Sequence, residues 1–412
     1  MKTIRLGDIC EKIGSGATPR GGSEVYQSSG VALIRSQNVY NDGFKKDGLA
    51  YITNQHAEEL ENVTVKHGDV LLNITGDSVA RVCQVPEELL PARVNQHVAI
   101  IRPWEDVLYA RYLRYFLISP EMQQYMLALA SAGATRQALT KGMIEAFEVP
   151  APPLPEQKAI ASILGALDDK IELNRKMNET LEAMARAIFK SWFVDFDPIP
   201  GLGPHKEWQD STLSKIPKGW RVVKVSEAFE INPLRSIKRG KEYAYVGMAS
   251  LPTASARVTD FAFRKFTGSG SKFKNGDVLL ARITPCLENG KTTLVDFLTE
   301  DEYGWGSTEF IVFGPKEPLN MWFVYCVARD QEFRNHAIRS MSGTSGRQRV
   351  ETGCFNNYMI VISPADVINK FGDIVGSWFN QMKVNDDQSI SLAFIRDALL
   401  PKLLSGEIRV RN

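Results

Sequence analysis

The stretch "KHGDVLLNITG" at residues 66–76 returns as "KNGDVLLARITP" at residues 274–285. The letters Gly-Asp-Val-Leu-Leu therefore recur at an offset of about 208 positions. Each copy is a short apolar run that follows a Gly-Asp turn signal, a pattern typical of a buried strand. A strand that recurs at this distance predicts an internal repeat, and a repeat changes how every other motif is interpreted.

Other stretches recur at nearly the same spacing, with the offset growing to about 212 as small loop insertions would produce. The matching pairs are "IRLGDICEKI" (4–13) with "WRVVKVSEAFEI" (220–231), "NQHVAIIRP" (95–103) with "STEFIVFGP" (307–315), and "TRQALTKGMIEAFEVP" (135–150) with "GRQRVETGCFNNYMIV" (346–361). The chain is therefore predicted to contain one module of about 210 residues twice.

Each copy has the same internal order. Short strands, Gly-rich turns and brief helical stretches come first, and they predict a mixed α/β globule; a long helix follows. We expect a first globule at 1–150, a central helix and linker at 151–208, a second globule at 209–364 and a C-terminal helix at 365–412.

The long helices are predicted from apolar residues that recur at alternating spacings of four and three, as in the core seam of a coiled coil. "PAPPLPEQKAI" (150–160) marks the start of the first helix. The predicted seam consists of Leu164, Leu167, Ile171, Asn174 and Leu181 in the first helix, and of Val375, Trp378, Met382, Asn385 and Leu392 in the second.

A helix over residues 156–193 would be about 57 Å long, which exceeds the width of a 150-residue globule. One interpretation is that each helix packs on its own globule. The other, which we favour, is that the two helices pair as an antiparallel coiled coil about a pseudo-two-fold axis. In that arrangement Asn174 and Asn385 should face each other and fix the register.

Composition restricts the function only weakly. The 412 residues carry a net charge of +1 and 44% hydrophobic residues, so two or three globular domains are expected and no global basic excess indicates nucleic acid. The five cysteines are scattered and contain no C-x-x-C pair, which predicts neither a disulfide framework nor a zinc site. Without a long apolar run, we expect a cytoplasmic protein with no membrane partner.

Catalytic motifs are hard to find. "PCLENGKTTL" (285–294) ends in the Gly-Lys-Thr of a nucleotide-binding P-loop, but Pro285 stands where the loop requires glycine. The residues after Lys291 are β-branched and aromatic, which predicts strands rather than the required helix. We expect a strand, a turn at residues 288–290 and a returning strand, with Lys291 and Thr292 placed for DNA backbone rather than ATP.

Several features together resemble one known family. They are the tandem arrangement, the paired "GDVLL" strands, "NQHV" and "STEF" at matching positions, "IPKGW" (216–220), "PPLPEQKAI" (152–160) and "LLPKLLSGEIRV" (399–410). Throughout the chain this pattern resembles the specificity subunit (HsdS) of type I restriction-modification systems.

The resemblance implies two target recognition domains that each read half of a bipartite, asymmetric DNA sequence, with the paired helices setting the spacing. It implies a non-catalytic subunit with no metal or cofactor of its own. Two methyltransferase subunits (HsdM) and two translocase/endonuclease subunits (HsdR) would supply S-adenosylmethionine, ATP and Mg chemistry. A methylation-only or type IIB-like complex, an ATPase and a coiled-coil adaptor without a DNA role remain alternatives.

Candidate DNA contacts are polar side chains in loops, because phosphates are bound by cations and small polar groups, and bases by side chains able to form paired hydrogen bonds. In the first globule we select Arg20, Arg35, Gln37, Asn38, Thr75, Asn95, Gln96, Arg136 and Gln137. In the second we select Lys238, Arg239, Arg282, Thr284, Asn289, Lys291, Thr308, Arg347, Gln348 and Arg349.

Overall fold

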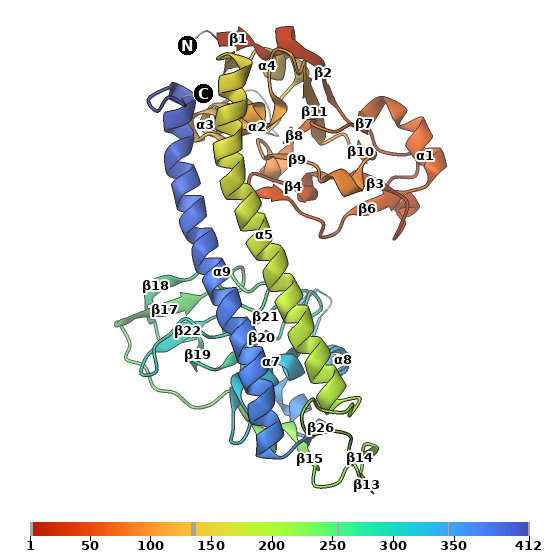
Figure 1. The fold of residues 1–412 in the computed structure, drawn as a ribbon, viewed down its shortest axis with the longest axis vertical. Coiled ribbons are helices and arrows are strands. Elements are labelled where there is room, and N and C mark those ends of the chain that lie inside the picture. The colour runs from red at the N-terminus through yellow and green to blue at the C-terminus, as the bar shows by residue number, and fades with distance from the viewer. Residues whose placement is uncertain (1–2, 133–136, 254, 345, 411–412) are drawn as a thin grey trace. The chain divides into compact units, whose positions relative to one another are not determined.

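The computed structural model describes residues 3–410 except 133–136, 254 and 345. The residues group into two compact units, Met1–Ile171 with Ser391–Asn412, and Glu172–Ile390. The strands from β1 to β12 form what we call the first module, and those from β15 to β26 form the second module (Figure 1). A two-stranded hairpin, β13 (Trp208–Asp210) with β14 (Lys215–Pro217), precedes the second module.

The first module contains two four-stranded sheets. One has the order β6 (Ala50–Ile52), β3 (Val31–Ile34), β10 (Ala92–Val94), β7 (Thr64–Val65). The other has the order β2 (Cys10–Ser15), β11 (Val98–Pro103), β8 (Val70–Asn73), β9 (Val82–Gln84). Smaller pairs are β1 (Thr3–Arg5) with β12 (Glu148–Pro150) and β4 (Val39–Tyr40) with β5 (Gly43–Phe44).

The second module repeats this topology. The order β18 (Ala262–Lys265), β17 (Glu242–Val246), β22 (Tyr303–Gly306), β19 (Ser271–Lys274) matches the first sheet. The order β16 (Phe229–Ile231), β23 (Phe310–Pro315), β20 (Val278–Ala281), β21 (Thr292–Leu294) matches the second. Small pairs are β15 (Arg221–Lys224) with β26 (Met359–Ile362) and β24 (Met341–Ser342) with β25 (Arg349–Val350).

Register confirms the repeat at the level of single residues. The two "GDVLL" strands become β8 and β20, each hydrogen-bonded on both sides within its sheet. β3 runs parallel to β10 as β17 runs parallel to β22. All residues of β8 and β20 are buried, because each strand lies at the centre of its module.

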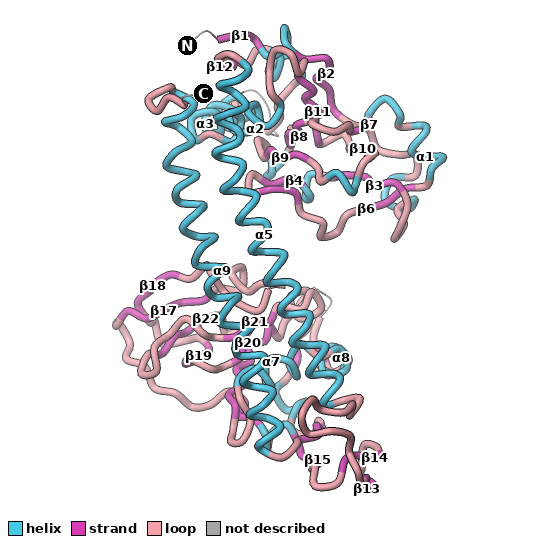
Figure 2. Tube along the Cα trace, viewed as in Figure 1, coloured by secondary structure: helices cyan, strands magenta, loops and turns pink. Residues whose placement is uncertain are grey.

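Helices complete each module. The first has α1 (Asn54–Glu59), α2 (Ala110–Ile118), α3 (Pro120–Ser131) and α4 (Lys141–Glu145); the second has α6 (Val225–Ala228), α7 (Met321–Arg329) and α8 (Gln331–Arg339). Figure 2 colours these helices cyan among magenta strands, so the predicted mixed α/β class is confirmed. Of the cysteines, Cys83 and Cys326 are buried, while the other three are only half-buried.

Two long helices follow the modules, α5 (Leu154–Phe193) and α9 (Ala365–Ser405). They pack against each other in antiparallel fashion in the second unit, since Asn174 contacts Asn385 and Ser389 whereas Asn178, one turn later, contacts Met382. In the first unit Arg396 of α9 pairs with Asp168 of α5 at 2.8 Å. The predicted pairing of the long helices is confirmed, and all ten predicted seam positions are buried or half-buried.

The interpretation that the long helices use their apolar stripes only on each other is incomplete. Ile160, Ala161 and Leu164 of α5 belong to the core cluster of the first module. Val367, Ile368, Phe371 and Val375 of α9 belong to that of the second. Each long helix therefore buries apolar side chains against two partners, its own module and the other long helix, because these contacts use different faces of the helix.

Candidate nucleic-acid interface

Five loops of the first module meet at one end of its sheets, and we call this end the first rim: residues 16–20, 35–38, 73–78, 95–97 and 137. The amide of Gly16 donates to Val98 and that of Asn95 to Ile34, which ties two of these loops to the strands. A side chain at Gly16 would collide with the carbonyl of Val94, so only glycine permits this approach.

Polar side chains form a chain across the first rim. The Thr18 hydroxyl donates to the Gln96 carbonyl oxygen, and the Gln96 amide nitrogen lies 3.1 Å from His97 Nε2. His97 Nδ1 lies 2.7 Å from Thr75 Oγ1. The backbone of Gln137 accepts a hydrogen bond of 3.1 Å from Gly76. Three predicted residues, Thr75, Gln96 and Gln137, are thus brought together: His97 lies between Gln96 and Thr75, and the Gln137 backbone is joined to the same loop through Gly76.

A second group in the first rim is built around a single carbonyl. Arg35 Nη2 and Gln37 Nε2 both donate to the oxygen of Gly48, at 2.5 and 3.0 Å. The Arg35 guanidinium also lies 5.2 Å from the centroid of the Tyr26 ring. These contacts hold an arginine and a glutamine, two side chains able to make paired hydrogen bonds to bases, in fixed positions at the surface.

Two predicted contacts in the first module are buried, which corrects the prediction that they lie at the surface. Asn38 is fully buried and donates to the carbonyls of Lys45 and Asp47, at 2.9 and 3.2 Å. Asn95 is 7% exposed, and its side-chain oxygen accepts from the amide of His97. Asparagine readily replaces backbone partners in turns, so both side chains stabilise the loops. Arg20 is exposed, and Arg136 lies outside the described residues.

The second rim occupies the corresponding end of the second module, at residues 282–284, 307–309 and 347–351. The amide of Arg282 donates to Glu309, and the amide of Thr284 donates to Gln348, both at 3.0 Å. The Arg349 guanidinium binds Glu309 at 2.8 Å, and Arg282 binds Glu351 at 3.0 Å. The structure brings together Arg282, Thr284, Thr308, Gln348 and Arg349, with Arg347 exposed in the same loop.

The remaining predicted residues of the second module lie elsewhere. Lys238 and Arg239 are exposed in the segment that follows β16, and Asn289 is exposed in the turn between β20 and β21. Glu309 and Glu351 are not among the predicted contacts, although Glu309 directly follows the predicted Thr308 and Glu351 lies two residues after the predicted Arg349.

The Gly-Lys-Thr segment forms the predicted turn and returning strand, because β21 pairs antiparallel with β20. Its amides are already engaged: Asn289 donates to Pro285, and Lys291 donates to Cys286. The Lys291 ammonium donates to the Met248 carbonyl at 2.8 Å, and Thr292 is fully buried. The expectation that Lys291 and Thr292 face DNA backbone is therefore corrected, since one is committed to its own loop and the other is inside.

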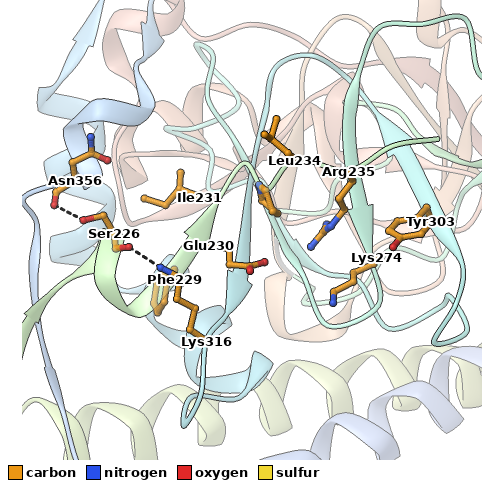
Figure 3. A pocket seen from close by; sticks show the side chains of 11 residues that line it. Ser226, Phe229, Glu230, Ile231, Leu234, Arg235, Lys274, Tyr303, Lys316 and Asn356 are labelled. Carbon is orange, nitrogen blue, oxygen red and sulfur yellow. Dashed lines mark hydrogen bonds between the residues drawn. The ribbon is translucent and has the colours of Figure 1, made fainter. Parts of the chain in front are cut away.

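A pocket of about 660 Å³ lies in the second module at the end of the strands opposite the second rim. It is basic: Arg235, Lys274 and Lys316 line it, with Glu230 as the acid (Figure 3). Arg235 is held by the buried carboxylate of Asp277, and Lys316 donates to the carbonyl of Ser226 at 2.9 Å. The pocket is open and polar, and it carries no group arranged for covalent chemistry.

Within the described part of the chain, no group of three or more His, Cys, Asp and Glu side chains is arranged to hold a metal ion. The helices found in residues 3–132, 137–253, 255–344 and 346–410 include none with the length and apolar character needed to cross a bilayer.

Both long helices are anchored by buried charges. In the first unit, Asp168 accepts from Arg114 at 2.8 Å, from the Tyr115 hydroxyl at 2.7 Å and from Arg396 at 2.8 Å. Burial alone would raise the pKa of Asp168, but these donors outweigh it and lower that pKa. In the second unit, Arg257 binds Asp386 of α9 at 2.5 Å and also Asp296. Burial raises the pKa of Asp386 despite the attraction of Arg257.

The centre of the helix pair is polar in the second unit. Asn174 Nδ2 donates to the Asn385 carbonyl at 3.1 Å, and Asn385 Nδ2 donates to the Asn178 side-chain oxygen at 2.8 Å. Asn174 and Asn385 therefore meet as predicted, but the side-chain partner of Asn385 on α5 is Asn178, one helical turn beyond Asn174. All three asparagines are buried.

Comparisons with known proteins give one consistent result. A family model described as the type I restriction modification DNA specificity domain matches residues 1–183. The type I restriction enzyme MjaIX specificity subunit of Methanocaldococcus jannaschii is 26% identical, over 99% of this chain and 93% of its own. The HindI specificity subunit of Haemophilus influenzae is 23% identical, over 99% of each chain.

The fold has a counterpart among solved structures. The crystal structure of the type I restriction-modification system S subunit from M. genitalium superposes with a TM-score of 0.53 at 14% identity, over 98% of this chain and 95% of that chain. The MjaIX and HindI subunits, which match nearly the whole sequence, are both type I specificity subunits, and a solved structure of such a subunit superposes on the duplicated module and the pair of long helices. Residues 1–183 carry a type I restriction modification DNA specificity domain, and nearly the whole chain is similar to type I specificity subunits.

Proposed function

We propose that this subunit reads an asymmetric, bipartite DNA sequence, one half with each module, and that the paired helices fix the number of unspecified bases between the halves. The observation that carries the proposal is the repetition of one topology in a single chain with two rims of different side chains. Two DNA-binding modules in one chain require two half-sites, and because the side chains of the two modules differ, the two half-sites should differ in sequence.

The two rims differ in the chemistry they offer to base edges. The first presents amides and an arginine, Gln37, Gln96, Gln137 and Arg35, which suit paired hydrogen bonds to adenine or guanine. The second pairs its arginines with Glu309 and Glu351, and a carboxylate can accept a hydrogen bond from cytosine. These side chains, together with the exposed Arg20, Arg347 and Gln348, are the proposed base and phosphate contacts.

The chain itself is proposed to be non-catalytic and cytoplasmic. Methyltransferase subunits would add the methyl group from S-adenosylmethionine, and translocase/endonuclease subunits would use ATP and Mg. The occupied amides around Lys291 support placing the nucleotide on a partner, because a P-loop requires free N–H groups for phosphate.

The test is the pattern of adenine methylation in the genome of the host, with and without this gene. Loss of one bipartite motif would give the function and both half-sites. Replacing residues 215–364 by the equivalent segment of another specificity subunit should then change one half and leave the other half and the spacing intact. A change in both halves would contradict the modular assignment.

A further inference from the structure

The outer side of one sheet differs between the modules. In the first module, Arg93 of β10 pairs with Leu33 of β3, and the corresponding pair in the second module is Trp305 of β22 with Tyr245 of β17. Helix α1 closes this side in the first module: Arg93 Nε donates to the Ala57 carbonyl at 2.9 Å, and Leu33 is fully buried.

Among the described residues of the second module, no helix closes the same side. The connection between β18 and β19 consists of residues 266–270 only, which Figure 2 draws as loop where the first module has α1. Phe266 and Ile237 pack on Trp305, but Tyr243 and Tyr245 stay half-buried. We call this side, with its neighbouring side chains, the open face.

Cations are held over the aromatic rings of the open face. The Arg264 guanidinium lies 4.3 Å from the Tyr245 ring centroid, the Lys272 ammonium 5.5 Å from Phe266 and the Lys241 ammonium 6.0 Å from Tyr243. Strand register puts these side chains on one side, because Arg264 pairs with Tyr243 and Lys272 with Trp305. The rings fix the cations in place without neutralising them.

The charges of the open face are not cancelled by acids. In the described part of the second module, the ion pairs are made by other cations, such as Arg235, Arg282 and Arg349. Arg264 and Lys272 stand on the two edge strands of a four-stranded sheet, so their Cα atoms are about 14 Å apart. Duplex DNA carries one charge per about 1.7 Å of its axis, and a row this wide spans several phosphates.

The open face also continues into the second rim. β22 carries Trp305 in the open face and leads directly into Ser307 and Thr308 of the rim. Rim arginines are paired with Glu309 and Glu351, which suits selection among bases more than attraction to phosphate. At the far end, Lys274 and Tyr303 join the open face to the basic pocket of Figure 3.

We propose that the open face binds the phosphate backbone of duplex DNA beside the bases read by the second rim. The first module has no equivalent surface at this place, because α1 occupies it. The proposal rests on the proposed function, since it names where the second recognition module meets the backbone of its own half-site. Lys241, Arg264 and Lys272 are the residues that make the contact.

The experiment measures DNA affinity of the assembled subunit and methyltransferase complex as a function of salt, with a duplex that contains the full target. Each lost phosphate contact lowers the slope of log K against log salt by about 0.9. The triple variant Lys241→Gln, Arg264→Gln, Lys272→Gln should therefore flatten the slope by about 2 to 3. The methylated sequence should stay the same, because the bases are read elsewhere.

A charge-matched control is Lys206→Gln, Lys215→Gln, Lys265→Gln. Lys265 follows Arg264 on β18 but points to the other side of the sheet, and all three lysines are exposed. This variant should keep the wild-type slope, as should the charge-conserving Lys241→Arg, Arg264→Lys, Lys272→Arg. Thermal unfolding of each variant checks that the module is folded.

The outcomes separate the two proposals. If the wild-type complex binds no duplex, the proposed function is wrong. If the wild type binds with a steep slope that the triple variant retains, only the open-face assignment is overturned. An equal loss of slope in the control variant would also overturn the open-face assignment. The assignment would be overturned too if the triple variant lost a protein subunit from the complex while its salt dependence stayed unchanged, because the open face would then bind protein rather than DNA.

Discussion

The two modules share one strand order but differ in what covers it. Helix α1 closes the outer side of the β6-β3-β10-β7 sheet, whereas a five-residue connection leaves the β18-β17-β22-β19 sheet open. The core strands are buried on both copies and tolerate little change, while connections at the surface can be exchanged at small cost. The difference shows that one scaffold can offer unlike surfaces when only its connections vary.

A buried carboxylate gives a second comparison. Asp69 and Asp277 follow the repeated glycine, and each accepts a hydrogen bond of 2.7 Å from a backbone amide three residues earlier. Arg102 of β11 neutralises Asp69, but Arg235, which follows β16, neutralises Asp277. Position 314, the counterpart of 102, is glycine, and a Cβ there would lie 3.3 Å from Asp277 Oδ1.

The buried aspartate of the repeated Gly-Asp turn therefore requires an arginine partner, but the position of that arginine in the chain can vary. A buried carboxylate without a cation is costly, and any arginine able to reach it satisfies the requirement.

The largest expected effect tests this shared requirement. Asp69→Ala and Asp277→Ala each remove the buried carboxylate that holds a half-buried arginine, so each should lower the stability of its own unit by about 3–5 kcal/mol. Hydrogen exchange followed by mass spectrometry measures the loss separately for the two units. Asp47→Ala and Asp301→Ala change exposed acids and serve as controls. A loss confined to one of the two buried positions would show that the modules do not share the requirement.

The helix anchors should respond to pH with opposite signs. Asp168 has a lowered pKa in the folded state, so its stabilisation is present above the unfolded value and is lost as pH falls through the folded pKa. Asp386 has a raised pKa, so its contribution is greatest at low pH and is lost as pH rises through the folded pKa.

Asp168→Asn should accordingly destabilise the first unit by about 2–3 kcal/mol at pH 7, and the difference from wild type should shrink as pH falls below the unfolded value of about 4 and vanish below the folded pKa. Asp386→Asn, the matched change in the second unit, should cost little or nothing at pH 7, because the neutral side chain is the form that burial favours there. Thermal unfolding across this pH range measures both. Equal losses at pH 7 would refute the contrast between the anchors.

The helix seam is apolar at Leu164 in the first unit and polar at Asn174, Asn178 and Asn385 in the second. Asn385→Leu should cost about 1–2 kcal/mol, because the Asn178 oxygen loses its donor. Replacing all three asparagines by leucine should recover that stability but weaken the register. The two measurements are thermal unfolding and the spacing between the methylated half-sites. If the triple variant kept one unchanged spacing, the asparagines would not be needed to fix the register.

The smallest expected effect concerns α1, the helix that closes the outer side of the β6-β3-β10-β7 sheet in the first module. The Thr53 hydroxyl accepts a hydrogen bond of 3.2 Å from the His56 amide and caps the first turn. Thr53→Ala should cost about 1 kcal/mol and increase hydrogen exchange within α1, whereas Thr53→Ser should cost less. Unchanged hydrogen exchange in α1 would show that the Thr53 cap does not stabilise this helix.

Much of the fold could be predicted because it depends on periodicity. Apolar spacing predicted the repeated "GDVLL" strands, the segments that pair with them and the long helices, because the spacing of apolar residues shows which positions are buried. The meeting of Asn174 and Asn385 was predicted because each lies near the centre of its long helix, and the centres of two antiparallel helices related by a two-fold axis face each other.

The candidate interface was harder to predict. Gln96 and Thr75 lie in the first rim, but Asn38 and Asn95 were indistinguishable from them in sequence although they are buried. Whether a polar loop residue faces solvent or holds its own backbone depends on where the loop turns, and no local pattern encodes that direction.

The duplication, the mixed α/β class, the long helices and the incomplete P-loop pattern could all be inferred from residue types at fixed spacings. The folded chain was needed to show that Arg35 and Gln37 share the carbonyl of Gly48, that Arg257 reaches Asp386 and that Arg264 and Lys272 lie on one open face. These arrangements are set by strand register and loop closure rather than by residue types at a fixed spacing.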